Sequence, residues 1–162
     1  MAVVGLDIDG VLTDIHKFQL EKGEKFFKEK FQKDVINRDA QEIDEIFGCD
    51  EKESRAFWTK YLMKYSIAEK ARNGAGTFTK ALHEKGDKIV IITSRVYTES
   101  NSVLGKTMRF IVEEWLKQNN IEYDEIVYCD EDKKEAIKLN NITKVFFDRE
   151  NDSSLGFESV SS

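Results

Sequence analysis

The sequence predicts an α/β protein, in which helices flank a parallel sheet and an all-helical module is inserted after the first strand. Four short runs rich in Val, Ile and Phe are separated by helical patterns, and each run is apolar along most of its length. Such continuous runs are typical of strands that are buried on both faces of a parallel sheet. The predicted strands are residues 2–6, 88–95, 125–129 and 144–148.

The inserted module is predicted for residues 15–72, where Lys, Glu and Phe are abundant and glycines are few. Asp39 is expected to cap a helix that ends at Phe47. Asp50 and Glu53 have the spacing of a capping box at the start of the next helix. After this module the chain returns to alternating helices and strands, so we expect one compact core and one small helical insert.

The composition excludes several classes of protein. The chain of 162 residues is 40% apolar and 35% charged, which is typical of a soluble globular protein. Its net charge of -6 argues against a nucleic-acid polymer as partner. No apolar run approaches the roughly 20 residues that span a membrane, and the start lacks the pattern of a signal peptide. We therefore expect a cytoplasmic protein, in which the distant Cys49 and Cys129 form neither a disulfide framework nor a metal-binding spacing.

The first predicted strand ends in two carboxylates, Asp7 and Asp9, followed by Gly10. Side chains two residues apart on a strand point the same way, and open α/β sheets bind ligands at the carboxyl ends of their strands. Two carboxylates at such a place suit a hard cation such as Mg²⁺, which also takes phosphate oxygens of a substrate. The alternatives are a solvated loop and a Ca²⁺ loop of the EF-hand kind, but the further ligands and the closing Glu of such a Ca²⁺ loop are missing.

Residues 7–14, with the sequence DIDGVLTD, resemble motif I (DxDGxxxD) of the haloacid dehalogenase-like (HAD) superfamily. The resemblance implies a Rossmann-like core and a phosphoryl transfer in two steps. Asp7 would attack phosphorus to form an aspartyl-phosphate, and Asp9 would first protonate the leaving oxygen and then activate water. Mg²⁺ would be held by Asp7, by Asp9 through its backbone carbonyl, and by Asp148.

In this superfamily a helical insert after motif I is called a C1 cap, which closes over the site and contacts the substrate. The resemblance therefore implies a HAD core domain of residues 1–14 and 73–162, and a helical cap of residues 15–72. The aromatic residues of the cap are expected mainly to pack against one another. Any that stay exposed are candidates for stacking on a base or a sugar.

The second predicted strand ends in Thr93, Ser94 and Arg95. An apolar strand that ends in Thr or Ser resembles HAD motif II, in which a hydroxyl group donates a hydrogen bond to a phosphate oxygen. Thr93 is the first choice because it comes first after the apolar run, and Ser94 is the second. For Arg95 the sequence leaves two options: a contact to phosphate or substrate, or a surface residue.

Motifs III and IV follow the third and fourth strands. A lysine at the start of the next helix would offset the charge of the nucleophile and the phosphate, and the sequence favours Lys133 over Lys134. Asp148 and Asp152 match the acidic pair of motif IV, where Asp152 would hold waters or the motif III lysine. Arg149 departs from relatives that carry a second aspartate at that position, which bears on metal affinity.

The whole arrangement is most similar to the 5'(3')-deoxyribonucleotidase-like group, which pairs a cap of this size with these motifs. That resemblance implies a small phosphorylated metabolite as partner, most plainly a nucleoside monophosphate. One alternative is a sugar-phosphate phosphatase of the same superfamily. Another, outside enzymes, is a catalytically weak HAD-fold binding module. A phospho-receiver domain fits less well, because its phosphorylated aspartate lies on a later strand.

Overall fold

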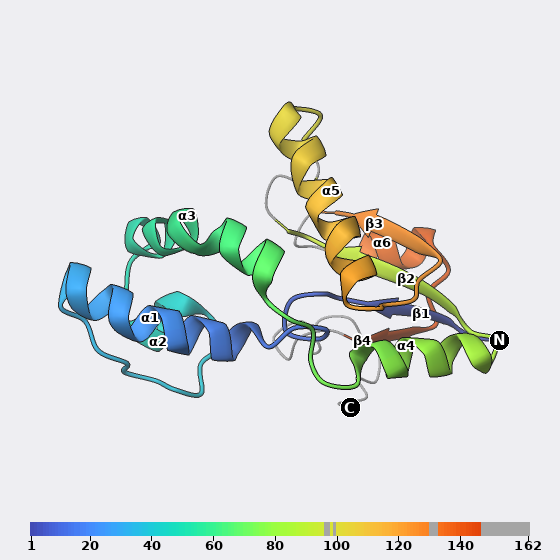
Figure 1. Ribbon diagram of the computed structural model, residues 1–162, viewed down its shortest axis with the longest axis horizontal. Helices are drawn as coiled ribbons and strands as arrows, with labels where there is room; N and C mark the ends of the chain where they lie inside the picture. Colours follow the sequence, from blue (N-terminus) through green and yellow to red (C-terminus); the bar gives the residue numbers. More distant parts are fainter. Residues whose placement is uncertain (96–97, 99, 130–132, 147–162) are drawn as a thin grey trace. The chain divides into compact units, whose positions relative to one another are not determined.

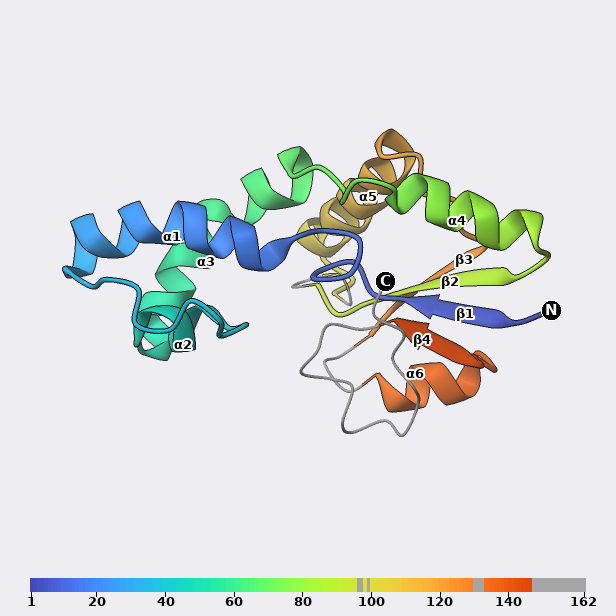
Figure 2. The same cartoon turned by 90° about the horizontal axis from the view of Figure 1, so that it is seen from below.

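A computed structural model describes residues 1–95, 98, 100–129 and 133–146 (Figures 1 and 2). The chain forms two compact units, which we call the core unit and the helical insert. The core unit combines Met1–Thr13 with Lys70–Ser162, and the helical insert is Asp14–Glu69. Among the described residues, no helix is long and apolar enough to cross a membrane.

The core unit is built on a four-stranded sheet whose described strands all run parallel, in the order β3-β2-β1-β4. The first strand of the chain is therefore an inner strand, and Leu6 at its end pairs with Ile91 on one side and Phe146 on the other. This architecture confirms the predicted α/β class with a parallel sheet. The strands are β1 (Val3–Leu6), β2 (Lys88–Thr93), β3 (Glu125–Tyr128) and β4 (Lys144–Phe146).

Helices cover both faces of this sheet (Figure 2). Helices α4 (Ala75–Glu84) and α5 (Val103–Gln118) pack on the face that carries Val4, Leu6 and Ile89. Helix α6 (Lys134–Leu139) packs on the other face. The central strands are thus shielded from water on both sides, which explains why their sequences are apolar without alternation.

The helical insert consists of α1 (Ile15–Phe31), α2 (Ile43–Phe47) and α3 (Glu51–Ala68) around a core of aromatic rings. The ring of Phe27 stacks on that of Phe47 at 4.5 Å between centroids. Gly23 allows this approach, because a Cβ atom there would lie 2.4 Å from the Phe47 ring. Close aromatic packing therefore stabilises the insert.

The two helix starts predicted in the insert have different outcomes. The capping box is present as predicted: Asp50 accepts from the amide of Glu53, and Glu53 accepts from the amide of Asp50. The predicted cap at Asp39 is wrong, because α2 begins only at Ile43. The amide of Asp39 instead donates to the side chain of Asn37 at 3.2 Å. Local turn formation by Asn has displaced the helix start.

Candidate functional site

Asp7 directly follows β1, at the carboxyl end of an inner strand, and only 6% of its surface is exposed. Its amide donates to the carbonyl of Phe146 at 3.1 Å, which continues the pairing of β1 with β4. Its Oδ1 accepts from the amide of Ile8 at 2.8 Å. The backbone thus fixes the position of a carboxylate that the apolar strand carries into the edge of the core.

The second oxygen of this carboxylate meets a buried lysine. Asp7 Oδ2 lies 2.8 Å from Lys133 Nζ, and Lys133 is 4% exposed. Burial raises the pKa of Asp7 to about 6, the charge of Lys133 opposes this rise, and the charge of Asp9 adds to it. The ion pair with Lys133 favours the ionised form of this carboxyl group, which is the form that a carboxylate nucleophile requires.

The structure distinguishes the two adjacent lysines at the start of α6. Lys133 is the residue that caps the helix, and its side chain points to Asp7. Lys134 is the first residue of the helix proper and is exposed. Periodicity alone could not separate them, because they are adjacent residues at the start of the same helix. The lysine preferred in the sequence analysis is thus the one that lies beside Asp7.

Asp9 has a cationic partner of its own. Arg95 Nη2 lies 2.7 Å from Asp9 Oδ1. The Arg95 side chain is 3% exposed, and the Asp9 side chain is 28% exposed. Of the two options that the sequence left for Arg95, that of a surface residue is excluded by this burial. The pair joins the segment after β1 to the segment after β2.

The hydroxyl-bearing end of β2 supports this arrangement. Thr93 is fully buried, and its Oγ1 accepts from the amide of Arg95 at 3.3 Å. Ser94, the second choice for a phosphate-binding hydroxyl, is partly exposed. Both residues lie where β2 ends, next to the end of β1 in the sheet. Thr93 and Ser94 therefore belong to the same edge of the sheet as Asp7.

The loop after β1 is held by a residue that the sequence analysis did not single out. Arg72 donates from Nε to the carbonyl of Thr13 and from Nη2 to that of Gly10, both at 3.2 Å. Its own amide donates to the carbonyl of Leu12 at 2.7 Å. Gly10 has a φ of 83°, a conformation that favours glycine and turns the chain directly after Asp9. No sequence motif predicted this role for Arg72, because its partners are backbone carbonyl groups, which do not depend on residue type.

The described part of the site suits a hard metal ion in the chemistry of its donors. Asp7 and Asp9 present carboxylate oxygens at one strand end, and Mg²⁺ binds through one or two carboxylates together with phosphate oxygens. Among the described residues there is no group of three or more His, Cys, Asp or Glu side chains that could hold a metal. The proposed third ligand, Asp148, lies outside the described residues, as do Arg149 and Asp152.

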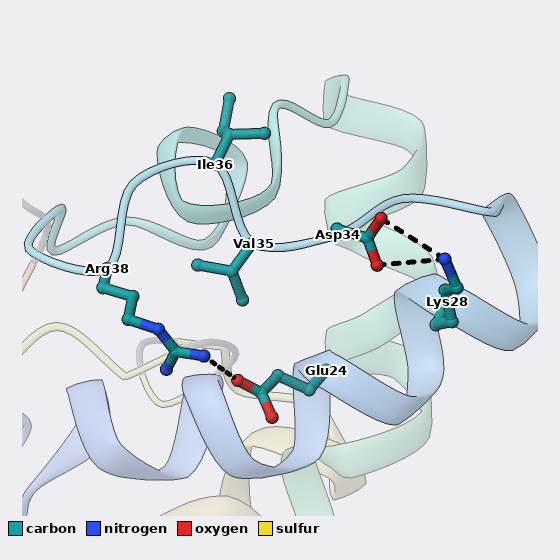
Figure 3. A pocket seen from close by; sticks show the side chains of 6 residues that line it. All are labelled: Glu24, Lys28, Asp34, Val35, Ile36 and Arg38. Atoms are coloured by element: carbon teal, nitrogen blue, oxygen red, sulfur yellow. Dashed lines mark hydrogen bonds and ion pairs between the residues drawn. The ribbon is translucent and has the colours of Figure 1, made fainter.

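The helical insert carries a hollow of about 350 Å³ whose charges are matched within it (Figure 3). Arg38 pairs with Glu24 at 2.6 Å, and Lys28 pairs with Asp34 at 3.1 Å. The remaining lining residues, Val35 and Ile36, are apolar. The residues that line this hollow thus offer no excess of positive charge for a phosphate group, and we assign it no ligand.

Comparison of the structure with solved structures reveals several similar chains. They include a candidate β-phosphoglucomutase from Thermotoga maritima (TM-score 0.55, 19% identity, covering 100% of this chain and 87% of that chain). A candidate phosphatase from Clostridium difficile is also similar (0.55, 17%, 97% and 82%). So is a predicted phosphatase from Clostridium acetobutylicum (0.51, 20%, 90% and 74%).

At these identities the similarity shows a shared fold alone, and it agrees with the predicted α/β class with a parallel sheet. No protein-family model matches the sequence, and no curated protein is significantly similar to it. The functional argument therefore depends on the chemistry of the site itself.

Proposed function

We propose that this protein is a phosphomonoester hydrolase that acts through an aspartyl-phosphate on Asp7 and depends on Mg²⁺. The observation that carries the proposal is the buried Asp7–Lys133 pair, at 2.8 Å, at the end of an inner strand. A buried charge pair is costly to maintain, so its place at the ligand-binding edge of the sheet favours a catalytic role. Two of the similar structures carry the name phosphatase, which supports the same class.

In the proposed first step, an Asp7 oxygen forms a bond to phosphorus while the bond from phosphorus to the ester oxygen breaks. Asp9 gives its proton to the departing oxygen. In the second step, Asp9 takes a proton from the water that attacks phosphorus, so that phosphate leaves and Asp7 is regenerated. Lys133 offsets the negative charge that gathers around the phosphoryl group.

The hydroxyl groups of Thr93 and Ser94 are proposed to bind phosphoryl oxygens. Mg²⁺ would be held by Asp7, by the backbone carbonyl of Asp9 and by Asp148, and when bound it supplies the charge that lets a carboxylate approach an anionic phosphate. We also propose that the helical insert is a cap for this site. The insert leaves the core unit directly after the segment that carries Asp9, which supports this role.

Two substrate classes remain, and different observations favour each. A sugar phosphate is favoured by similarity to a candidate β-phosphoglucomutase over most of both chains. A nucleoside monophosphate is favoured by the sequence resemblance to the deoxyribonucleotidase-like group. We place the sugar phosphate first, because the structural similarity includes the whole length of this chain.

The test is release of inorganic phosphate from a panel of sugar phosphates and nucleoside monophosphates, with and without Mg²⁺. Asp7→Asn serves as the blank for contaminating phosphatases. Release that requires both Mg²⁺ and Asp7 would support the proposal, and the best substrate on the panel would decide between the two classes. If the wild-type protein releases no phosphate from any substrate, the hydrolase proposal is wrong and a binding module becomes the better interpretation.

A further inference from the structure

The motifs left the role of Arg95 undecided, but its surroundings in the structure are specific. The guanidinium group donates from Nη2 to Asp9 Oδ1 at 2.7 Å while 97% of the side chain is shielded from solvent, since 3% is exposed. Arg95 and Asp9 are 86 residues apart in the sequence. Moving a guanidinium group out of water costs free energy unless a partner is close and well oriented. The Asp9 carboxylate is such a partner, so the buried position of Arg95 depends on this contact.

The backbone of Arg95 is anchored as firmly as its side chain. Its amide donates to Thr93 Oγ1 at 3.3 Å. Its carbonyl accepts from the hydroxyl of Thr98 at 2.6 Å and from the amide of Thr98 at 3.3 Å. Thr98 is itself buried. Arg95 therefore approaches Asp9 from a fixed base at the end of β2, not from a loose surface loop.

We propose that Arg95 is a positioning residue for Asp9, and that it holds the Asp9 carboxyl group in the orientation needed for proton transfer to the leaving oxygen. This inference rests on the proposed function. The proton donor must meet the departing oxygen at hydrogen-bond distance as the bond from phosphorus breaks. A carboxyl group that is 28% exposed and directly precedes a turn at Gly10 would otherwise rotate among several orientations. Arg95 fixes one oxygen and thereby orients the other.

The inference predicts a dependence on the leaving group. An alkyl phosphate releases an alkoxide unless a proton is supplied, so its cleavage needs Asp9 in place. The leaving group of 4-nitrophenyl phosphate departs as a stable phenolate, and its cleavage needs the proton far less. The ratio kcat/KM reports the steps up to release of the alcohol, so it isolates this proton transfer from the later attack of water.

The experiment compares Arg95→Gln with the wild type on an alkyl phosphate and on 4-nitrophenyl phosphate. We expect kcat/KM to fall about 100-fold on the alkyl ester, the usual contribution of general acid catalysis, and less than about threefold on the nitrophenyl ester. Arg95→Lys, which keeps the charge but loses the planar donor geometry, should fall in between on the alkyl ester. Thermal unfolding of each variant checks that it is folded. If Arg95→Gln does not fold, the comparison of the two esters is made with Arg95→Lys instead.

The matched control is Arg109→Gln. Arg109 Nη1 donates to the carbonyls of Thr98 at 2.5 Å and Ser100 at 2.8 Å, so it supports the same segment from α5. Its loss should affect both esters by the same factor. An equal fall on both esters in Arg95→Gln would overturn the positioning role. Absence of turnover in the wild type would instead overturn the proposed function, so the two failures are distinguishable.

Discussion

The core unit and the helical insert differ in what they bury. Among the described residues, every buried charged side chain belongs to the core unit: Asp7, Asp87, Arg95 and Lys133. The buried polar side chains of the insert, Gln19 and Ser66, are uncharged. The insert buries mainly aromatic rings, with Phe27, Phe47 and Phe57 almost fully shielded from solvent.

This difference separates stability from function. Aromatic rings gain free energy when they leave water, whereas a charged group loses it unless a partner compensates. Three of the four buried charges lie at the edge of the sheet where β1 and β2 end. The core unit therefore buries charged groups at this edge although their burial costs free energy. Such burial is expected of an active site.

The largest effect is expected for Asp7→Asn. Loss of the nucleophile should lower kcat by at least about 10³-fold, since removal of a catalytic nucleophile leaves only binding and charge stabilisation. Phosphate release under saturating substrate and Mg²⁺ measures the effect. Asp7→Asn with near wild-type turnover would contradict the nucleophile assignment.

Asp87→Asn is the matched control, because Asp87 is also buried but lies at the other end of β2. Its Oδ1 accepts from the amide of Ala2 at 2.8 Å, and Lys85 lies 3.3 Å from its Oδ2. This substitution should lower the thermal stability while leaving kcat unchanged. A matching fall of kcat in both variants would mean that burial of charge, and not position at the site, explains the result.

Lys133→Gln should have the next largest effect, in both activity and stability. We expect kcat to fall about 10²-fold, since a cation beside the reacting phosphoryl group is lost. Breaking a buried ion pair also costs about 3–5 kcal/mol of unfolding free energy. Lys134→Gln, one position later and exposed, should change neither quantity appreciably. Equal effects of the two variants in kinetics and urea unfolding would contradict the choice of Lys133.

In the insert, Phe57→Ala tests the opposite side of the comparison. The Phe57 ring lies 5.5 Å from that of Phe26 and 4.9 Å from that of Tyr61, and its residue is fully buried. Truncation should cost about 3–5 kcal/mol, through lost burial and the cavity that remains. Hydrogen exchange of backbone amides should become faster across the insert. Ile36→Ala, at a residue that is 70% exposed, should leave exchange unchanged.

The same experiment asks whether the two units are separately stable. Amides of the core sheet should keep their wild-type exchange rates in Phe57→Ala, because the aromatic cluster lies within the insert. A comparable acceleration in β1 and β2 would show that the units unfold together. In that case the core unit and the helical insert would differ in which side chains they bury, but they would not be independently stable.

Much of the core was predictable because its rules are local. The four strands lie within the predicted ranges, with β2 ending at Thr93 and β4 starting at Lys144. Alternation along a strand is a fixed geometry, so two aspartates after an apolar run could be assigned to one sheet edge from the sequence alone. The capping box was predictable for the same reason, since its contacts join residues three apart.

The remaining features depend on contacts between distant residues. No periodic pattern in the sequence predicts the ion pair of Arg95 with Asp9. The same is true of the hydrogen bonds from Arg72 to the loop after β1. The start of α2 was mispredicted because two local signals competed, and the Asn37 turn prevailed over a cap at Asp39. Roles of site residues that depend on such partners require the fold before they can be inferred.

The smallest effect is expected for an ion pair of the core unit that is not buried. His83 Nε2 lies 2.9 Å from Asp124 Oδ2, and their side chains are 27% and 42% exposed. The hydrogen bond that His83 donates to Asp124 raises the pKa of His83 above 6.5, although partial burial opposes the rise. Burial raises the pKa of Asp124, but the amide of Ile89 and His83 lower it further, to a net value below 3.8.

The sign of each shift gives the pH window of this pair. The contribution of His83 is complete below pH 6.5 and is lost as the pH rises through its raised folded-state pKa. That of Asp124 is present above pH 3.8 and is lost as the pH falls through its lowered pKa. The difference in melting temperature between wild type and His83→Gln should therefore be largest between these two values and shrink on either side. Its size should correspond to less than about 1 kcal/mol, as for exposed pairs, because solvent screens both groups. A larger difference would mean that membership of the core unit, and not burial, makes a charge pair important, and the contrast drawn with Asp7 and Lys133 would fail.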